Sequence, residues 1–309
     1  MQPEKNLLLI HTPTKQAISD WEAIIEQIKA TAPDIEVRIA NNHALSPAIA
    51  RWQISRPSLV FSPVRLSKYK PEGGRIYAGG YTDKLDEYKR MTAIGIPVPR
   101  SAQFTGSSHL DPAIWGEFVI LKPNTSAFGR GVILAKSELA ARQYSYIANG
   151  QVSYLIQQFV DHTDDHGYLV DYRVLLLLGA PLYCHARRGS MPRRPLAELA
   201  SIGANDIASN TDNYAVRSLC FEADVLALAK RVSQAFPDNP VLGVDIVRDR
   251  KSGQLFVIEA NASGSVWHLS SNFGQAFLSQ ELREQSYKQF DALNAAAERL
   301  IEKTRSDAV

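Results

Sequence analysis

The C-terminal part of the chain contains Gly243-Val244-Asp245-Ile246-Val247 and, after a polar turn, Leu255-Phe256-Val257-Ile258-Glu259-Ala260-Asn261-Ala262-Ser263. Two short apolar runs joined by a turn over 248–253 predict a β-hairpin. Glu259 and Asn261 are two residues apart, so they share one face of a strand, and Asp245 reaches that face if the hairpin closes. Two carboxylates and an amide oxygen form a hard ligand set that suits Mg²⁺. The alternative is an ordinary surface hairpin, which is the weaker interpretation because unpaired charges beside a core are costly.

The composition limits the class of protein. The 309 residues are 45% hydrophobic, enough for a large core in two or three subdomains. The chain has 34 Lys and Arg against 32 Asp and Glu, which gives no electrostatic argument for a nucleic-acid or membrane partner. Cys184 and Cys220 are too few for a disulfide framework and indicate buried thiols in a reducing compartment. No apolar run is long enough to span a bilayer, so we expect a cytoplasmic protein.

The pattern of strands and helices predicts an α/β fold with α+β subdomains, in three parts. Residues 1–83 alternate strand and helix signals, which is typical of a small parallel α/β domain, and 63–82 is expected to be a connecting loop. Residues 84–158 are expected to form an α+β module that begins with a helix over 84–94, which ends at Gly95 and Pro97. Residues 159–309 are expected to hold the hairpin together with two long strands (168–178 and 182–186) and two long helices (223–236 and 280–303).

A lysine and a loop of small residues suggest a phosphate site. Lys122 ends the apolar strand that starts at Phe118, and the loop 124–130 precedes a second strand over 131–135. Backbone N–H groups of such a loop can bind phosphate oxygens while the lysine supplies a point charge. The loop is neither a Walker loop nor a dinucleotide fingerprint. By itself, a solvated lysine at a strand end is the common alternative.

The segment Gln157-Gln158-Phe159-Val160 ends another apolar strand, and Asp171-Tyr172-Arg173 follows. A short apolar segment with free backbone groups suits the edge of an adenine, and an acidic residue that follows suits ribose hydroxyls. A plain core strand is the more common explanation of the segment alone.

Taken in this order, the three motifs resemble the ATP-grasp superfamily, and most of all its RimK-type branch, which is related to glutathione synthetases and D-alanine ligases. The resemblance runs from Asp83-Lys84 to Ser265, and Gly95-Ile96-Pro97-Val98-Pro99 resembles the family's entry into the nucleotide-binding lid. It implies an ATP-grasp fold behind an N-terminal pre-ATP-grasp domain, with 84–158 as the lid part and 159–309 as the C-terminal part.

The resemblance also implies roles for individual residues. Lys84 and Lys122 would contact ATP phosphates, Gln157 to Val160 would read adenine, and Asp171 would lie near the ribose. Arg173 and Arg188 would lie near the phosphates or an acylphosphate, so Arg173, Arg188 and Lys122 are the expected catalytic residues. Asp245, Glu259 and Asn261 would bind Mg²⁺, with two ions expected and Mn²⁺ as a substitute. The phosphate loop would use Ser126, Gly129 and Gly131.

The sequence departs from the family at several points. The loop Ser126–Gly131 has less glycine than is usual, Gln158 stands where relatives often have Glu, and Ser263-Gly264-Ser265-Val266-Trp267-His268 replaces a proline-glycine element. The last difference lies on the acceptor side. The stretch 187–213, with Arg187, Arg188, Arg193 and Arg194, is expected to be a mobile loop beside the site.

These observations predict an ATP-dependent carboxylate–amine ligase that forms an amide bond through an acylphosphate. Amino acids or peptides are the expected substrates, and a homo-oligomer is left open. The alternatives are a phosphotransferase of the same fold and a nucleotide-binding regulatory protein without turnover. The His and Asp residues over 161–166 fit a solvated turn better than a metal site, because no element fixes their spacing.

Overall fold

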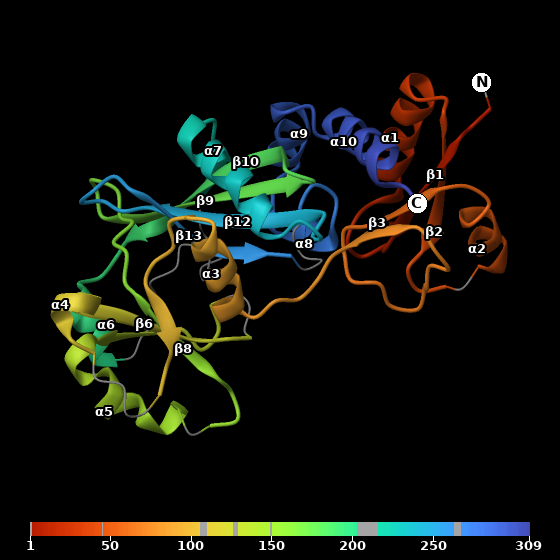
Figure 1. Cartoon of the computed structure of the whole chain (residues 1–309). Helices are drawn as coiled ribbons and strands as arrows, with labels where there is room; N and C mark the ends of the chain where they lie inside the picture. The colour runs from red at the N-terminus through yellow and green to blue at the C-terminus, as the bar shows by residue number, and fades with distance from the viewer. Residues whose placement is uncertain are drawn as a thin grey trace.

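The computed structural model describes residues 2–44, 46–105, 110–125, 129–148, 150–202, 216–262 and 267–309. Within these ranges the strands form a central sheet, with an N-terminal sheet on one side and a smaller sheet on the other, as Figure 1 shows. Ser126 and Ser265, which the sequence placed at the site, lie outside the described residues. No helix in these ranges is long and apolar enough to cross a membrane.

The N-terminal sheet is parallel throughout, which confirms the predicted α/β arrangement. Its strands are ordered β2-β1-β3-β4. They are β1 (Lys5–His11), β2 (Ile35–Asn41), β3 (Ser58–Ser62) and β4 (Arg75–Ala78), with helices α1 (Ile18–Thr31) and α2 (Pro47–Gln53). The expectation of a loop over 63–82 is wrong at β4. This edge strand buries only Tyr77, so it has no apolar run to predict it.

The C-terminal helix packs between the N-terminal domain and the central sheet, where it also contacts β10 (Ala180–Pro192). Helix α10 (Ala292–Asp307) lies against α1, β1 and β3, and Leu300 joins Trp21 in one buried cluster. Helices α8 (Asn272–Phe277) and α9 (Gln280–Gln289) precede it. The single helix expected over 280–303 is therefore wrong. It is broken at Asp291, whose φ of 51° is left-handed and is tolerated by Asp better than by most residues.

The smaller sheet is antiparallel in the order β5-β8-β6-β7, which confirms a compact α+β module. Helix α3 (Lys84–Ala93) leads into it. The remaining elements are β5 (Ser101–Gln103), α4 (Pro112–Trp115), β6 (Phe118–Pro123), β7 (Ile133–Lys136), α5 (Ser137–Ala148) and β8 (Tyr154–Gln158). Strand β7 begins two residues later than expected, because Gly129 and Gly131 adopt positive φ values of 67° and 75°.

The central sheet is antiparallel in the order β11-β10-β9-β12-β13. Its strands are β9 (Tyr168–Leu177), β10 (Ala180–Pro192), β11 (Val216–Leu219), β12 (Val241–Arg248) and β13 (Leu255–Asn261). Helix α7 (Ala223–Val232), continued by the 3₁₀ turn η1 (Ser233–Ala235), covers one face, where Val174 and Val244 pack against Val225. Because side chains alternate along a strand, the polar residues of these strands lie on the opposite face.

The prediction of a loop over 187–213 is only partly correct. Strand β10 continues through Arg187 and Arg188 to Pro192, and α6 (Leu196–Ile202) follows. This part of β10 has no apolar run that would predict a strand, because Arg187 pairs with Asp171 of β9 and Arg188 pairs with Asp164, which precedes β9. Residues 203–213 lie outside the described residues.

Candidate active site

The hairpin β12–β13 brings the predicted metal ligands together. Asp245 lies directly opposite Glu259, and Gly243 lies opposite Asn261. Asn261 Nδ2 is 3.4 Å from Asp245 Oδ2, so its amide oxygen remains for another ligand. The register shifts between Asp245 and Ile246, so an irregularity of the bulge type lies within the paired segment, directly beside Asp245 and Glu259. The ligand set is therefore assembled by strand pairing, and bulges of this kind commonly re-aim side chains next to sites.

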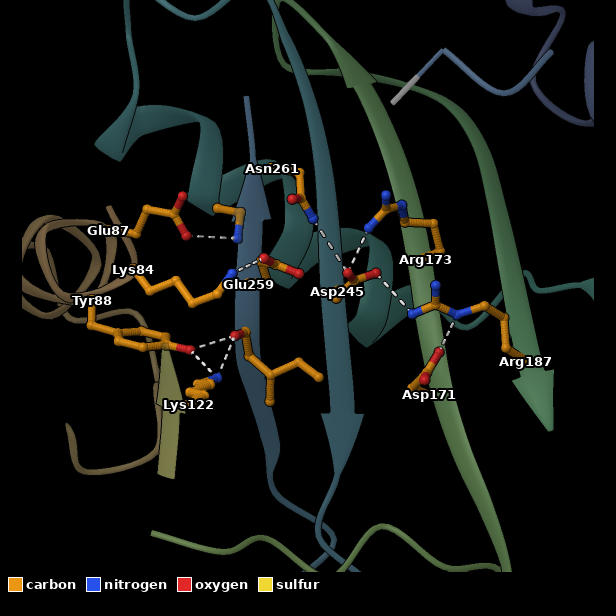
Figure 2. Close-up of polar contacts among 12 residues, drawn as sticks. Lys84, Glu87, Tyr88, Lys122, Asp171, Arg173, Arg187, Asp245, Glu259 and Asn261 are labelled. Atoms are coloured by element: carbon orange, nitrogen blue, oxygen red, sulfur yellow. Dashed lines mark hydrogen bonds and ion pairs between the residues drawn. The ribbon is translucent and has the colours of Figure 1, made fainter. Parts of the chain in front are cut away.

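Two arginines hold the buried Asp245 (Figure 2). Arg173 lies opposite Asp245 on β9 and donates to its Oδ2 at 2.5 Å, and Arg187 of β10 donates to its Oδ1 at 2.9 Å. Arg187 also donates to Asp171, which lies opposite it across β9 and β10. All four side chains are at most 10% exposed. Two carboxylates and two guanidinium groups thus compensate one another where isolated charges would be very costly.

Arg173 has one hydrogen-bond donor that its ion pair with Asp245 does not use. Among the described residues, its Nε is buried without a hydrogen-bond partner. Burial lowers the pKa of Arg173, but Asp245 more than compensates and the pKa is raised overall, so the guanidinium stays charged. A buried donor without a partner calls for a missing acceptor, and a phosphate or carboxylate oxygen meets that need.

Two lysines approach the hairpin from outside the central sheet. Lys84, the first residue of α3, forms an ion pair with Glu259. Burial favours the neutral form of Glu259, but Lys84 outweighs it and lowers the pKa of this carboxyl group. Lys122 of β6 donates to Tyr88 Oη at 2.6 Å, and Tyr88 donates to the carbonyl of Ile258 at 2.5 Å. Both lysines therefore lie at β13, and their contact with ATP phosphates stays a prediction.

The charge state of Lys122 is finely balanced. Burial and the nearby Lys84 ammonium lower the pKa of Lys122 to about 7, against an ordinary value of 10.5. A lysine whose ammonium lacks a carboxylate at contact distance is expected to shift in this direction. An anion bound beside Lys122 would restore its charge.

A cavity of about 390 Å³ opens at this site. Its walls include Lys84 and Glu87 of α3, Arg130 of the loop after β6, and Glu259 and Asn261 of β13. Glu87 was not among the predicted site residues, although its position three residues after Lys84 places both on one helix face. Burial and the neighbouring Glu259 raise the pKa of Glu87 to about 8. Tyr88 and Arg187 were also missed. For Arg187, the two-residue alternation of a continued β10 is the signal that could have found it.

The loop after β6 requires glycine at its end. A Cβ atom on Gly131 would lie 2.9 Å from Pro123 and 3.1 Å from the Tyr154 hydroxyl, and its φ is left-handed. Gly129 is left-handed as well. The two glycines therefore allow a tight approach of backbone that other residues would block.

The segment 157–160, which the sequence predicts to bind adenine, lies at the end of β8. Gln157 is buried and donates from Nε2 to the Ser101 hydroxyl at 3.0 Å. The backbone N–H groups of Gln158 and Phe159 donate to the carbonyls of Arg100 and Phe118, and Val160 offers its carbonyl to His162. The role of this segment in reading adenine stays a prediction.

The structure does not bring Arg188 into the charged cluster. Arg188 points away from Arg187, pairs with Asp164 at 2.7 Å and lies over the Tyr168 ring at 3.5 Å. Arg193 contacts Asp161 at 3.3 Å and lies over the Phe159 ring, while Arg194 pairs with Glu198 of α6. Arg187, and not Arg188, therefore lies beside Asp245, and the role of Arg188 near the phosphates stays a prediction.

The oxygen set fits a magnesium ion. Asp245, Glu259 and Asn261 supply two carboxylates and an amide oxygen, and within the described residues no group of three His, Cys, Asp or Glu side chains forms a separate metal cluster. A site with few protein ligands is typical of Mg²⁺, which keeps waters and substrate phosphates as its other ligands.

Comparison with known proteins identifies the fold. No protein-family model matches the sequence, and a search of curated proteins found no match. The ATP-grasp ligase PsnB, solved with Mg, ADP and a phosphomimetic variant of its minimal precursor, is 13% identical over 98% of this chain and 100% of its own, with a TM-score of 0.55. A Chryseobacterium gregarium RiPP-associated ATP-grasp ligase is 13% identical over 100% of both chains, with a TM-score of 0.53. D-cycloserine synthetase DcsG is 16% identical over 96% of this chain and 99% of its own, with a TM-score of 0.52. The chain has the ATP-grasp fold.

Proposed function

We propose that the chain is an ATP-dependent carboxylate–amine ligase that uses Mg²⁺. The observation that carries this proposal is the meeting of oxygen ligands and cations at one hairpin. Asp245 and Glu259 lie opposite each other on β12 and β13, and Lys84 and Lys122 reach the same place from α3 and β6. The solved ATP-grasp structures of similar fold, among them a ligase with bound Mg and ADP, support this assignment.

Each group has a defined task in this proposal. Lys84 and Lys122 bind phosphate oxygens, and Arg173 uses its unpartnered Nε for the transferred phosphoryl group or the acyl oxygen. Asp245, Glu259 and Asn261 hold magnesium, which neutralises charge on the phosphates. Arg187 positions Asp245 rather than touching substrate. Ser126, Gly129, Gly131, the segment 157–160 and Asp171 complete the nucleotide site.

The proposed reaction consists of a phosphoryl transfer followed by an acyl transfer. A carboxylate oxygen of one substrate takes the terminal phosphoryl group of ATP, and ADP leaves. The amine nitrogen of the second substrate then forms a bond to the acyl carbon, the bond from that carbon to the phosphate oxygen breaks, and the amine loses a proton. An amide, ADP and phosphate result. The loop after β6 and the smaller sheet exclude water from the acylphosphate, which would otherwise hydrolyse.

The substrates we propose are amino acids or peptides, because the similar ligases include peptide-binding ones. The cytoplasm remains the proposed compartment, in keeping with two free buried cysteines.

The test is ADP formation with pooled amino acids and peptides. A ligase requires a carboxylate and an amine together for full turnover. A phosphotransferase forms ADP with one substrate and without an amide product, and a regulatory protein forms none. Mass spectrometry of the products separates the first two outcomes, and either of the last two would contradict the proposal.

A further inference from the structure

Glu87 is a buried acidic side chain that has no cationic partner among the described residues. It is 6% exposed, and its hydrogen bond within the described ranges is a 3.4 Å contact from the Ala260 N–H to Oε2. Across the same part of the chain, no lysine or arginine lies within ion-pair distance of it, whereas Glu259 and Asp245 are both paired. A buried carboxyl group without a cation is neutral, and a bound cation favours its charged form, so Glu87 is suited to a cationic ligand that the described residues do not supply.

The side chain of Glu87 faces the proposed reaction centre. Its contact at Ala260 lies between Glu259 and Asn261, and Figure 2 shows it reaching across to β13 beside the Lys84–Glu259 pair. Glu87, Glu259 and Asn261 line the same cavity of about 390 Å³. That volume lies within the range of small-molecule sites and exceeds what a metal ion alone would fill.

We propose that Glu87 binds the ammonium group of the amine substrate in this cavity and so sets the enzyme's preference for a cationic acceptor. The proposal rests on the ligase function proposed above. An ammonium group is compact and carries three donors, which suits a carboxylate that is nearly enclosed. The same cavity already accommodates one, because Lys84 places its ammonium group on Glu259.

The position of Glu87 also fits the order of the reaction. An amine held there lies next to the strand that would carry the magnesium ligands, and so beside the place where the acylphosphate forms. Once the ammonium group has lost a proton to solvent, the amine nitrogen would have a short path to the acyl carbon, and holding two reactants in this way accounts for much of the rate of such reactions. The rival occupant is a second magnesium ion, for which Glu87 would be a ligand.

The experiment measures binding of amino-acid amides to the full-length protein saturated with Mg²⁺ and ADP. A panel of amino-acid amides is compared with the same panel acetylated on nitrogen, which removes the cation. We expect at least one amide to bind and its acetylated counterpart not to bind. Glu87→Gln should weaken binding of that amide at least about tenfold, in line with loss of a charge-assisted hydrogen bond, and Glu87→Asp should restore part of it.

Asp86→Asn is the matched control. It removes a carboxylate from the same helix, but Asp86 is exposed and pairs with Lys89, so amide binding should stay at the wild-type level. The magnesium-dependent affinity for ADP should be unchanged in Glu87→Gln. Equal amide affinity in Glu87→Gln and wild type, or no amide binding by the wild type, would overturn the proposed role of Glu87. Neither result would contradict the proposed ligase function. Loss of the magnesium effect in Glu87→Gln would favour the metal-ligand role instead. A wild-type protein that does not bind ADP with Mg²⁺ would overturn the proposed function as well.

Discussion

At the scale of single residues, the charged groups of the site are tied to one another rather than to solvent. Asp245 accepts from both Arg173 and Arg187, and Asp171 accepts from Arg187. Removing one member leaves the others buried without compensation, which costs far more than the pair itself contributes. Variants at this site therefore divide into those that damage the fold and those that report on chemistry.

Asp245→Asn belongs to the first group. We expect it to lower the free energy of unfolding by about 3–5 kcal/mol, because the buried Arg173 loses its anion and Arg187 keeps only Asp171. Urea denaturation followed by circular dichroism measures the change. Asp164→Asn is the control, since its pair with the 39%-exposed Arg188 is partly solvated and should contribute about 1 kcal/mol or less. Similar losses in the two variants would show that the cluster is not a structural unit.

Lys122→Met should weaken ATP binding by about 1.5–3 kcal/mol in calorimetry, the range for a charge-assisted contact. The same substitution should raise the stability of the fold rather than lower it. The pKa of Lys122 is about 7 in the folded protein and 10.5 as the ordinary value, so between these pH values the unfolded chain binds a proton that the folded chain does not. Charging Lys122 therefore costs stability in full below about pH 7, and that cost fades as the pH rises towards 10.5.

The variant should consequently be more stable than the wild type below about pH 7, and the difference should shrink at higher pH. Lys89→Met, which changes an exposed lysine of α3, should show neither effect. Unchanged ATP affinity in Lys122→Met would mean that the lysine has no part in phosphate binding.

At the scale of elements, strand pairing places the site. The hairpin β9–β10 turns at Leu178 and Gly179, whose φ values are 47° and 84°. This turn sets the register in which Arg187 lies opposite Asp171. A slip of one strand by one residue would put these two side chains on opposite faces of the sheet.

Gly179→Ala should test this turn. An added Cβ would lie 3.2 Å from the Ser233 hydroxyl in a left-handed conformation, so we expect a loss of about 1–2 kcal/mol in unfolding free energy. Gly189→Ala, at a strand glycine outside the left-handed region whose nearest neighbour would be at 3.5 Å, should be close to neutral. Thermal unfolding compares the two variants. If Gly179→Ala is as stable as the wild type, the turn does not require glycine at this position.

Sequence patterns predicted the elements whose apolar residues repeat and missed those whose residues do not. The hairpin β12–β13 was predicted because two apolar runs lie on either side of the polar turn 248–253. The end of β10 was missed because its side chains pair with charges that are distant in sequence. Arg188 rather than Arg187 was named as a site residue because the resemblance implied it. The two are adjacent, and only the register of β10 against β9 shows which one faces Asp245.

At the scale of the molecule, the site lies where the central sheet, helix α3 and the smaller sheet meet (Figure 1). Long-range packing of this kind is not encoded in local patterns. The helix α10 illustrates it, since Ala296 and Leu300 pack against residues of α1 nearly a chain length away. The boundaries of the three predicted parts remain a prediction, and α10 shows that the last part also supports the first.

The smaller sheet should close over nucleotide. It is joined to the rest of the chain near Pro97–Pro99 and after Gln158, and closure would exclude water from the site. Amide hydrogen exchange over residues 129–136 should slow when Mg²⁺ and a non-hydrolysable ATP analogue are added. Exchange in β1, far from the site, serves as the control and should not change. Identical exchange with and without nucleotide over 129–136 would count against a lid.

The central claim is that the hairpin β12–β13 holds the magnesium ion of a bound nucleotide, and Glu259 tests it most directly. Unlike Asp245, Glu259 is 26% exposed and pairs only with Lys84 among the described residues, so Glu259→Gln should remain folded. The measurement is calorimetric titration of ADP with and without Mg²⁺. We predict that Mg²⁺ raises the ADP affinity of the wild type at least about tenfold, or roughly 1.4 kcal/mol, and that Glu259→Gln loses this gain. A folded Glu259→Gln protein that keeps the full magnesium effect would contradict the account.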